Sequence, residues 1–289
     1  MTACRYQAFS PPPLSLKEFR LLAGFIGEKT GILVSDAKRI MVESRLRKRL
    51  VALRLEAYGQ YCDYLFSPGG MERELPHFID AVTTNKTDFF REPEHFRFLS
   101  ERAVPELLAA RGSGPRRQLS IWSAAASTGN EAYTLAMTMG EFCRVHPGAA
   151  PEWSILASDI SEEVLERGRT AIYSREEAAP IPEALKKRYL LKSRDPGRGL
   201  VRIVPGLRRR VRFQRINLVG HDLGLTKPMD IIFCRNVFIY FDQRLQERIV
   251  ARLCRLLRPG GYLFTGHSEL LNCRPVPLTS VAPSIYRRS

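Results

Sequence analysis

Polar side chains recur where the apolar segments of this 289-residue chain end. Residues 119–125, 153–160, 211–218 and 229–237 are short apolar runs that predict strands, and helical patterns lie between several of them. In an open parallel sheet the carboxyl ends of the strands form one edge, where ligands bind. The polar residues at these ends are Ser127, Glu131, Asp159, Asn217, Arg235, Asn236 and His267. Their agreement across several strands predicts a ligand-binding site at that edge.

One segment, IWSAAASTGNEAYTLA (121–136), predicts a strand that turns through small residues into a helix. Such a turn brings the backbone close to a nucleotide-like ligand. The segment does not contain GxGxxG, because Gly129 is its only glycine. Asp159 follows after about one βαβ unit, and an acidic residue at the end of the second strand typically hydrogen-bonds ribose hydroxyls. An ordinary βαβ unit without a ligand is the alternative interpretation.

The elements that must position these residues divide the chain into three parts. Residues 14–80 carry apolar residues at helical spacing and predict a small all-α domain. Residues 81–95 form a linker whose doubly aromatic sequence TNKTDFFRE either lines a cleft or packs two domains together. Residues 96–289 predict a doubly wound α/β domain, interrupted at about 174–210 by a small inserted β element.

Several finer expectations concern the ends of elements. Ser15 and Glu18 have the spacing of a capping box at the start of the first helix. Helices are expected at 71–82, 161–173 and 242–257, with a turn at 259–261 and a last edge strand at 284–287.

Composition limits the class of protein. No apolar run approaches the ~20 residues of a membrane span, and residues 1–15 lack the apolar core of a signal peptide. Six scattered cysteines form no CxxC pair, so neither a zinc site nor a disulfide framework is indicated, and a reducing cytoplasm is the simplest setting. The net charge of +15 permits nucleic acid, an anionic membrane surface or an acidic protein as partner.

The positive charge is concentrated in the predicted second helix. Residues 35–55 hold seven basic and two acidic side chains, a local balance of +5. A solvated helix face is the ordinary interpretation, and a docking face for an acidic partner is the alternative.

The motifs taken together resemble the CheR family, the chemotaxis receptor methyltransferases. The resemblance covers the chain from about residue 80 to the end, and the helical region before it fits as well. The matching segments are TNKTDFFRE (84–92), WSAAASTGNEAYTLA (122–136), ASDIS (157–161), INL (216–218), IFCRNVFIYFD (232–242), LRPGGYLF (257–264) and GHSE (266–269).

This resemblance implies a function, a cofactor and a fold. The family transfers a methyl group from S-adenosylmethionine to glutamate side chains of chemoreceptors, giving methyl esters and S-adenosylhomocysteine. The implied fold is the Rossmann-like methyltransferase sheet with an inserted β subdomain, after an all-α N-terminal domain. The implied partners are the glutamate-bearing cytoplasmic helices of methyl-accepting receptors and a receptor C-terminal tail, which the turn Asp195–Gly199 would grip. We expect a cytoplasmic monomer that neither binds nucleic acid nor inserts into the membrane.

The resemblance also implies roles for individual residues. The family often reads GEEPY where this chain reads GNEAY, and Glu131 keeps the second acidic position. Arg91 and Tyr240 match the positions closest to the transferred methyl group and are the expected catalytic residues. No metal is expected. The positions that match cofactor contacts are Asn85, Thr87, Arg91, Glu131, Asp159, Asn217, Leu218, Arg235 and Asn236.

The implied chemistry joins a sulfonium cation to a carboxylate. Glutamate has a pKa of about 4.3 and is ionised at pH 7, so no general base is needed. A dry, aligned cleft favours the displacement, and an arginine or tyrosine would orient the carboxylate. With this chemistry the basic helix is expected to dock the receptor, and Arg45, Arg49 and Arg54 are the expected docking residues for receptor glutamates.

Three other classes remain as alternatives. A nucleic-acid methyltransferase fits the charge, but base amino-methylation usually needs an Asn/Asp-Pro-Pro-aromatic turn where this chain has Arg235, Asn236, Val237 and Phe238. A nicotinamide-dependent oxidoreductase would need GxGxxG. A non-catalytic scaffold that binds S-adenosylmethionine is the third, and the presence of Arg91 and Tyr240 argues against it.

Overall fold

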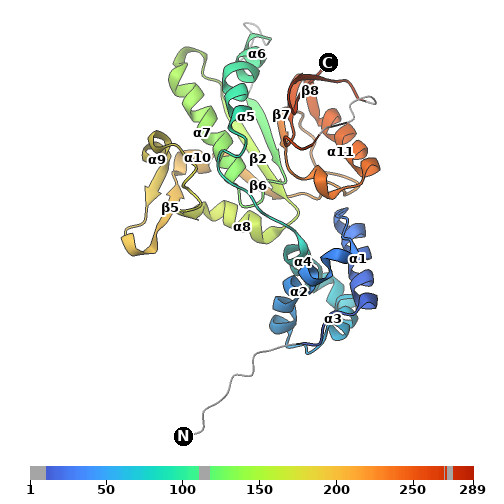
Figure 1. Cartoon of the computed structure of the whole chain (residues 1–289). Helices are drawn as coiled ribbons and strands as arrows, with labels where there is room; N and C mark the ends of the chain where they lie inside the picture. The colour runs from blue at the N-terminus through green and yellow to red at the C-terminus, as the bar shows by residue number, and fades with distance from the viewer. Residues whose placement is uncertain (1–10, 111–117, 270, 272–275) are drawn as a thin grey trace. The chain divides into compact units, whose positions relative to one another are not determined.

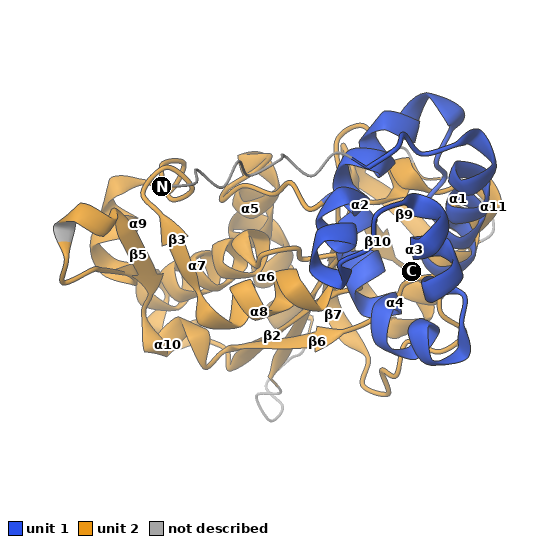
Figure 2. Ribbon diagram, turned by 90° about the horizontal axis from the view of Figure 1, so that it is seen from below, with its two compact units in different colours: residues 1–84 blue, residues 85–289 orange. Residues whose placement is uncertain are grey.

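The computed structural model describes residues 11–110, 118–269, 271 and 276–289. The chain forms two compact units, residues 1–84 and residues 85–289, which Figure 2 colours separately. Each unit has its own hydrophobic core.

The first unit is all-α, as the sequence predicts. Helix α1 (Leu16–Thr30) begins at a capping box in which Ser15 and Glu18 bond to each other's backbone, so that expectation is confirmed. The helix ends at Gly31, whose φ of 73° suits a residue without a side chain. A short 3₁₀ turn, Asp36–Lys38, then leads into α2 (Arg39–Leu53) and α3 (Tyr58–Leu65).

Helix α4 (Pro68–Val82) begins three residues before the predicted start at Met71. Ser67 caps it by accepting a hydrogen bond from the backbone of Gly70, and Pro68 occupies the first helical position. The Ser-Pro-Gly-Gly sequence therefore starts the helix.

The second unit is built on a seven-stranded sheet. Its spatial order is β6-β2-β1-β7-β8-β10-β9. The first five of these strands are parallel, and β10 runs antiparallel to both of its neighbours. The strands are β1 (Leu119–Ala124), β2 (Trp153–Asp159), β6 (Val211–Arg215), β7 (Met229–Cys234), β8 (Leu257–Phe264), β9 (Leu278–Ala282) and β10 (Ile285–Arg288).

Helices cover both faces of this sheet (Figure 1). The chain moves from β1 to β2 in one direction and from β7 to β8 in the other. Because parallel crossovers are right-handed, the connecting helices α7 (Asn130–Val145) and α11 (Gln243–Leu256) lie on opposite faces. The segment α5 (Pro93–Phe98), a π-helical turn (Leu99–Ala103) and α6 (Val104–Ala109) form one nearly continuous helix before the sheet.

A small subdomain interrupts the unit between β2 and β6. It contains a three-stranded antiparallel sheet of order β3-β5-β4, formed by Ile172–Ser174, Leu200–Ile203 and Leu190–Lys192. The helix predicted at 161–173 ends earlier, since α8 spans Glu162–Thr170 and Ala171 adopts a left-handed φ of 53°. The remaining elements are the helices α9 (Glu183–Tyr189) and α10 (Pro205–Arg208) and a 3₁₀ turn at Pro196–Arg198.

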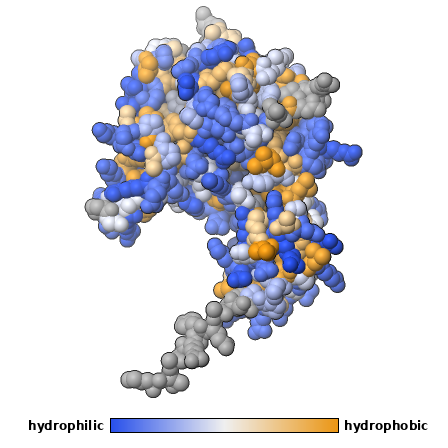
Figure 3. Space-filling view, in the orientation of Figure 1, coloured by the Kyte–Doolittle hydropathy of each residue, from blue (hydrophilic) through white to orange (hydrophobic). Residues whose placement is uncertain are grey.

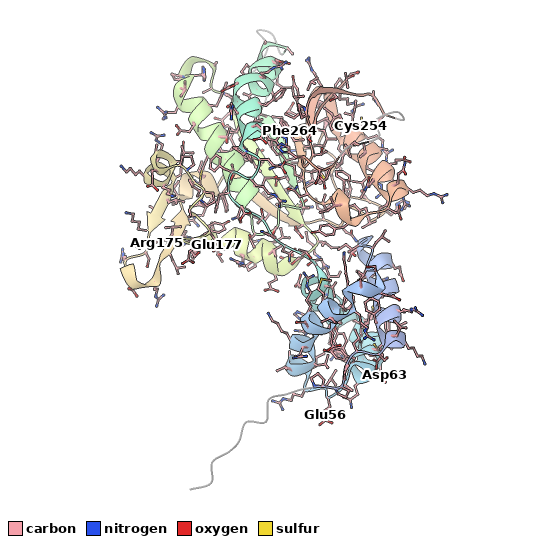
Figure 4. The ribbon with its side chains drawn as sticks, in the orientation of Figure 1. Glu56, Asp63, Arg175, Glu177, Cys254 and Phe264 are labelled. Carbon is pink, nitrogen blue, oxygen red and sulfur yellow. The ribbon has the colours of Figure 1, made fainter. Side chains whose placement is uncertain are left out.

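The last strands differ most from the prediction. The expected turn at 259–261 lies within β8, and the strand expected at the sheet edge is β10, which lies between β8 and β9. The apolar centre of the sheet includes Phe233 and Phe264, stacked with their centroids 4.1 Å apart. Figure 4 labels Phe264 among these side chains.

Candidate functional site

The turn between β1 and α7 holds an unusual backbone. Ala125, Ser127 and Gly129 have φ angles of 58°, 50° and 85°, in the left-handed region. For a residue with a side chain this conformation costs on the order of 1 kcal/mol and is found mostly at functional sites. The small side chains predicted to leave room for a ligand therefore also permit the fold of the turn.

Asp159, at the end of β2, holds this turn in place. Its two carboxylate oxygens accept hydrogen bonds from the backbone N–H of Ser127 (2.9 Å) and of Ser161 (3.0 Å). The side chain is buried. The predicted ribose-binding residue is thus beside the small-residue turn, as expected of a βαβ unit that binds a nucleotide-like ligand.

The linker segment packs along the same turn. The hydroxyl of Ser127 donates to the carbonyl of Asn85 (2.7 Å), and the N–H of Phe90 donates to Thr134 on α7 (3.1 Å). Phe89 is buried edge-to-face against Tyr173, with centroids 4.9 Å apart. These contacts bring residues 85–92 to the carboxyl edge of the sheet, where the polar residues lie.

Arg235 connects three parts of the site. Its guanidinium forms ion pairs with Glu131 at 3.0 Å and with Glu92 at 2.9 Å, and it donates to the carbonyl oxygen of Arg91 at 2.5 Å. Only 2% of its side chain is exposed. Burial acts to raise the pKa of Glu92, but the hydrogen bond and charge of Arg235 outweigh it and hold that pKa below its usual value. Glu131 also accepts from the Ser123 hydroxyl at 2.7 Å.

The loop after β7 is held by Glu269. This carboxylate accepts hydrogen bonds from the backbone N–H groups of Asn236 (2.8 Å), Phe238 (2.8 Å) and Gly266 (2.7 Å). Burial raises the pKa of Glu269, although these N–H groups act to lower it. Glu269 is not among the site residues predicted from the sequence. Its position in the GHSE motif, just after a strand end, is the signal that would have suggested a role for it.

The other expected site residues lie in the linker and in the segments that follow β6 and β7. Arg91 is half-buried between Phe90 and Glu92, whose φ angles of 55° and 57° are both left-handed. Tyr240 is half-buried and ends a short 3₁₀ turn, Phe238–Tyr240. Asn217 and Leu218 lie two and three residues beyond Arg215, the last residue of β6, so the strand predicted at 211–218 ends before them. Thr87 is half-buried in the linker.

Comparison with known proteins gives the family. The model of the CheR methyltransferase SAM binding domain matches residues 85–284, and the model of the CheR all-alpha domain matches residues 17–83. The chain belongs to the CheR methyltransferase family. Its membership, its methyltransferase fold and its S-adenosylmethionine cofactor are thereby confirmed as the sequence analysis expected.

Several curated relatives of this CheR chain carry the name chemotaxis protein methyltransferase. The one from Escherichia coli strain K12 is 42% identical over 89% of this chain and 85% of its own length. The relative from Klebsiella aerogenes is 43% identical over 89% of this chain and 84% of its own length. The relative from Salmonella typhimurium is 42% identical, with the same coverage of 89% and 84%.

The residues present fit S-adenosylmethionine. This cofactor offers an ammonium group and ribose hydroxyls, which carboxylates such as Glu131 and Asp159 bind well. The side chains at 124–127, after β1, are small and leave room for a ligand. The backbone is closely packed at Gly266, because a Cβ there would lie 2.4 Å from the side-chain amide nitrogen of Asn236. The CheR site therefore combines anionic groups with a closely packed backbone.

A possible cation cluster lies next to this site. Glu92, His95 and His267 place one ligand atom each within 4.8 Å of one another. However, Glu92 is already paired with Arg235 at 2.9 Å, and that positive charge opposes a second cation. His267 instead contacts Glu94 at 2.7 Å. The arrangement gives no support for a metal centre.

The three predicted docking residues of the first unit have different surroundings. Arg45 donates to two backbone carbonyls at the end of α4 and to the Thr84 hydroxyl. Arg49 forms a two-pronged ion pair with the buried Glu74, at 2.7 and 2.8 Å. Arg54 is exposed and ends α2 in a left-handed conformation with φ of 55°. Arg54 is therefore the most available of the three for a partner.

Proposed function

We propose that this chain methylates glutamate side chains of chemotaxis receptors, using S-adenosylmethionine and giving glutamate 5-O-methyl esters and S-adenosylhomocysteine. The observation that carries the proposal is the match of both family domains over nearly the whole chain. The named relatives supply the setting, chemotaxis, and the products follow from the chemistry of a carboxylate acceptor.

The site supports this chemistry without a general base. A glutamate acceptor is already ionised near neutral pH. The cofactor supplies a methyl group on a positively charged sulfur, whose charge is lost on transfer. Glu131 and Asp159 hold the donor, while Arg91 and the Tyr240 hydroxyl orient the acceptor carboxylate by donating hydrogen bonds. The proposed cofactor-binding residues are Asn85, Thr87, Arg91, Glu131, Asp159, Asn217, Leu218, Arg235 and Asn236.

Packing around the site supports the positions of these groups. Arg235 is fixed by two acidic partners and so presents its backbone, and that of Asn236, in one orientation. Rigid placement of donors and acceptors is what alignment of a displacement reaction requires. Water is kept from the reacting atoms by aromatic residues such as Phe90 and Phe238, which lie partly or fully buried beside the site.

The proposed protein partner is the methylated region of a receptor. Glutamates on a receptor helix would contact the basic helix α2 through Arg54 and the exposed Arg47 and Lys48. Arg45 and Arg49 would add to the positive electrostatic potential of this face. The turn at Asp195–Gly199, in which Asp195 and Arg198 are exposed and Gly199 has a φ of 60°, is the proposed grip for a receptor tail.

We propose that the reaction takes place in the cytoplasm and that the chain acts as a monomer. The described cysteines, Cys62, Cys143, Cys234 and Cys254, are all free thiols, as in a reducing compartment. In the part of the chain that the structure describes, no helix is both long and apolar enough to cross a membrane.

Transfer of labelled methyl groups from S-adenosylmethionine to receptor-containing membranes tests the proposal. After mild alkali we expect the label to be released as methanol, because carboxyl methyl esters hydrolyse and N-methyl groups do not. Label that stays on protein would mean nitrogen methylation. Absence of transfer, with S-adenosylhomocysteine still bound, would favour a non-catalytic scaffold. Membranes that lack receptors serve as the control.

A further inference from the structure

A groove lies on the second unit between α10, β6 and α7, and it contains none of the residues assigned above. Its volume is about 490 Å³. Volumes of roughly 300–1,000 Å³ are typical of small-molecule sites. The lining residues are Tyr133, Arg169, Pro205, Arg208, Arg209, Val211, Arg212 and Phe213.

Four of these residues are arginines, and their charges are unevenly compensated. Arg169 is neutralised by Glu162 at 2.6 Å and by Glu166 at 3.1 Å. Arg208, Arg209 and Arg212 have no carboxylate partner among the described residues. In addition, the Nε of Arg208 is buried and has no hydrogen-bond partner among the described residues. Three uncompensated guanidinium groups around one cavity repel each other unless an anion lies between them.

An aromatic floor completes the groove. Phe213 and Tyr133 have centroids 5.9 Å apart, and the Tyr133 hydroxyl is turned inward to donate to the carbonyl of Gly168 at 2.9 Å. The Phe213 ring is half-buried and packs against Gly129 and Gly168. A Cβ on Gly129 would lie 2.9 Å from the ring, and a Cβ on Gly168 would lie 2.4 Å from it. The floor is therefore rigid and apolar, while the arginines supply charge at its rim.

We propose that this arginine groove binds a nucleotide that carries two or more phosphate charges. The guanidinium fork binds phosphate oxygens two at a time, and three such groups together suit a ligand that carries several phosphate charges. The exposed side of Phe213 and the planar guanidinium groups offer surfaces on which a base stacks. A concave cavity with an apolar floor suits such a small ligand better than an extended polyanion.

The groove is chemically distinct from the S-adenosylmethionine site. That site presents the carboxylates of Glu131 and Asp159 to a cofactor without phosphate, whereas the groove presents uncompensated cations. The two sites nevertheless share a wall, because Phe213 touches Gly129, the residue that precedes α7 at the cofactor turn. A ligand in the groove would lie directly behind that turn.

Isothermal titration of the full chain with ATP, GTP and inorganic pyrophosphate tests the proposal. All titrations contain saturating S-adenosylhomocysteine, so that nucleotides cannot enter the cofactor site, and about 150 mM salt, which screens long-range attraction. We expect at least one nucleotide to bind, and to bind at least tenfold more tightly than pyrophosphate. Failure of both nucleotides to bind would overturn the proposal, and equal binding of pyrophosphate would overturn its nucleotide part.

A pair of triple variants separates the groove from the general positive charge. Arg208→Gln, Arg209→Gln and Arg212→Gln together should weaken nucleotide binding at least tenfold. The matched control is Arg175→Gln, Arg244→Gln and Arg248→Gln, which removes the same charge from exposed positions outside the groove. Equal losses in the two variants would mean a diffuse electrostatic effect and would overturn the site. Unchanged S-adenosylhomocysteine affinity in both verifies that they are folded.

Discussion

The Glu269 carboxylate accepts the backbone N–H of Asn236 at 2.8 Å, and Asn236 itself has a left-handed φ of 58°. A single acidic side chain after β8 thus stabilises a strained residue after β7. The same carboxylate bonds to Phe238, at the start of the turn that carries Tyr240. Glu269 is thereby a positioning residue for the loop, because its partners there are backbone N–H groups.

Replacing this residue tests that role. Glu269→Gln keeps the shape but replaces one acceptor oxygen with an NH₂ group, which faces N–H donors. Loss of a charge-assisted hydrogen bond costs about 1.5–3 kcal/mol, so we expect kcat to fall about tenfold or more, with little change in KM for the receptor. Steady-state methylation kinetics measure this. Glu163→Gln, at an exposed position on α8, should behave as wild type.

Asp159 is expected to act mainly through the cofactor. In Asp159→Ala the turn loses its acceptor for Ser127, and the proposed ribose contact is lost as well. We expect the dissociation constant of S-adenosylhomocysteine, measured by titration calorimetry, to rise about tenfold to a hundredfold, in line with one or two charge-assisted hydrogen bonds. An unaltered dissociation constant would remove Asp159 from the cofactor site.

Tyr240 is expected to act on the reaction instead of on binding. Tyr240→Phe removes only the hydroxyl, so cofactor affinity should stay within about twofold while kcat falls about tenfold or more, as for loss of one transition-state hydrogen-bond donor. Single-turnover methyl transfer with saturating cofactor measures the step directly. Turnover equal to that of wild type would show that the hydroxyl has no part in the reaction.

His95 makes stability depend on pH. Burial lowers its pKa from 6.5 to about 4, with Arg235 and His267 acting in the same direction and Glu92 and Glu94 opposing them. Above pH 6.5 the imidazole is neutral in both folded and unfolded chains, so its contribution is fully present. As pH falls from 6.5 towards 4, only the unfolded chain takes up the proton, and stability declines by about 1.4 kcal/mol per pH unit.

Unfolding by urea at several pH values checks this dependence. His95→Phe should make the decline between pH 6.5 and 4 shallower, since this position then takes up no proton on unfolding. His221→Phe, at an exposed position, should retain the slope of wild type. A slope that stays the same in His95→Phe would assign the acid sensitivity to other groups.

The predicted docking residues should separate into structural and recognition roles. Arg49→Met leaves Glu74, whose side chain is 2% exposed, without its counter-ion, and we expect the free energy of unfolding to fall by about 3 kcal/mol. Arg54→Met should change it by less than about 0.5 kcal/mol but raise KM for receptor membranes, with a loss that shrinks at high salt. If Arg54→Met leaves KM and its salt dependence unchanged, α2 does not dock the receptor through Arg54.

Local patterns predicted most of the fold. The capping box at Ser15, the strand that ends on Asp159 and the helix that begins at Asn130 depend on neighbouring residues and agree with the structure. The strands at the end of the chain do not follow from local patterns. The position of β10 between β8 and β9 is decided by pairing across the sheet, which no run of residues reveals.

The site shows the same limit. Strand ends indicated where Asp159 and Arg235 would lie, because a parallel sheet gathers its carboxyl ends at one edge. The ion pairs of Arg235 join residues more than a hundred positions apart, so spacing gave no sign of them. Arg49 was placed on a charged helix face, yet it pairs with a buried carboxylate. The position of a charged residue in a sequence does not show whether its side chain faces water or a partner.

The arrangement of β8, β10 and β9 also bears on how the protein is made. A nascent chain that has emerged only through Phe264 presents β8 as an open edge, with Tyr262, Leu263 and Phe264 all apolar or aromatic. Residues 278–282 do not cover that edge, because β9 pairs with β10 and with no other strand in the part of the chain that the structure describes. The parallel strands can assemble during translation, but this edge stays unprotected until residues 285–288 leave the ribosome. We therefore expect an interval during synthesis in which the edge of β8 is open to pairing with another chain.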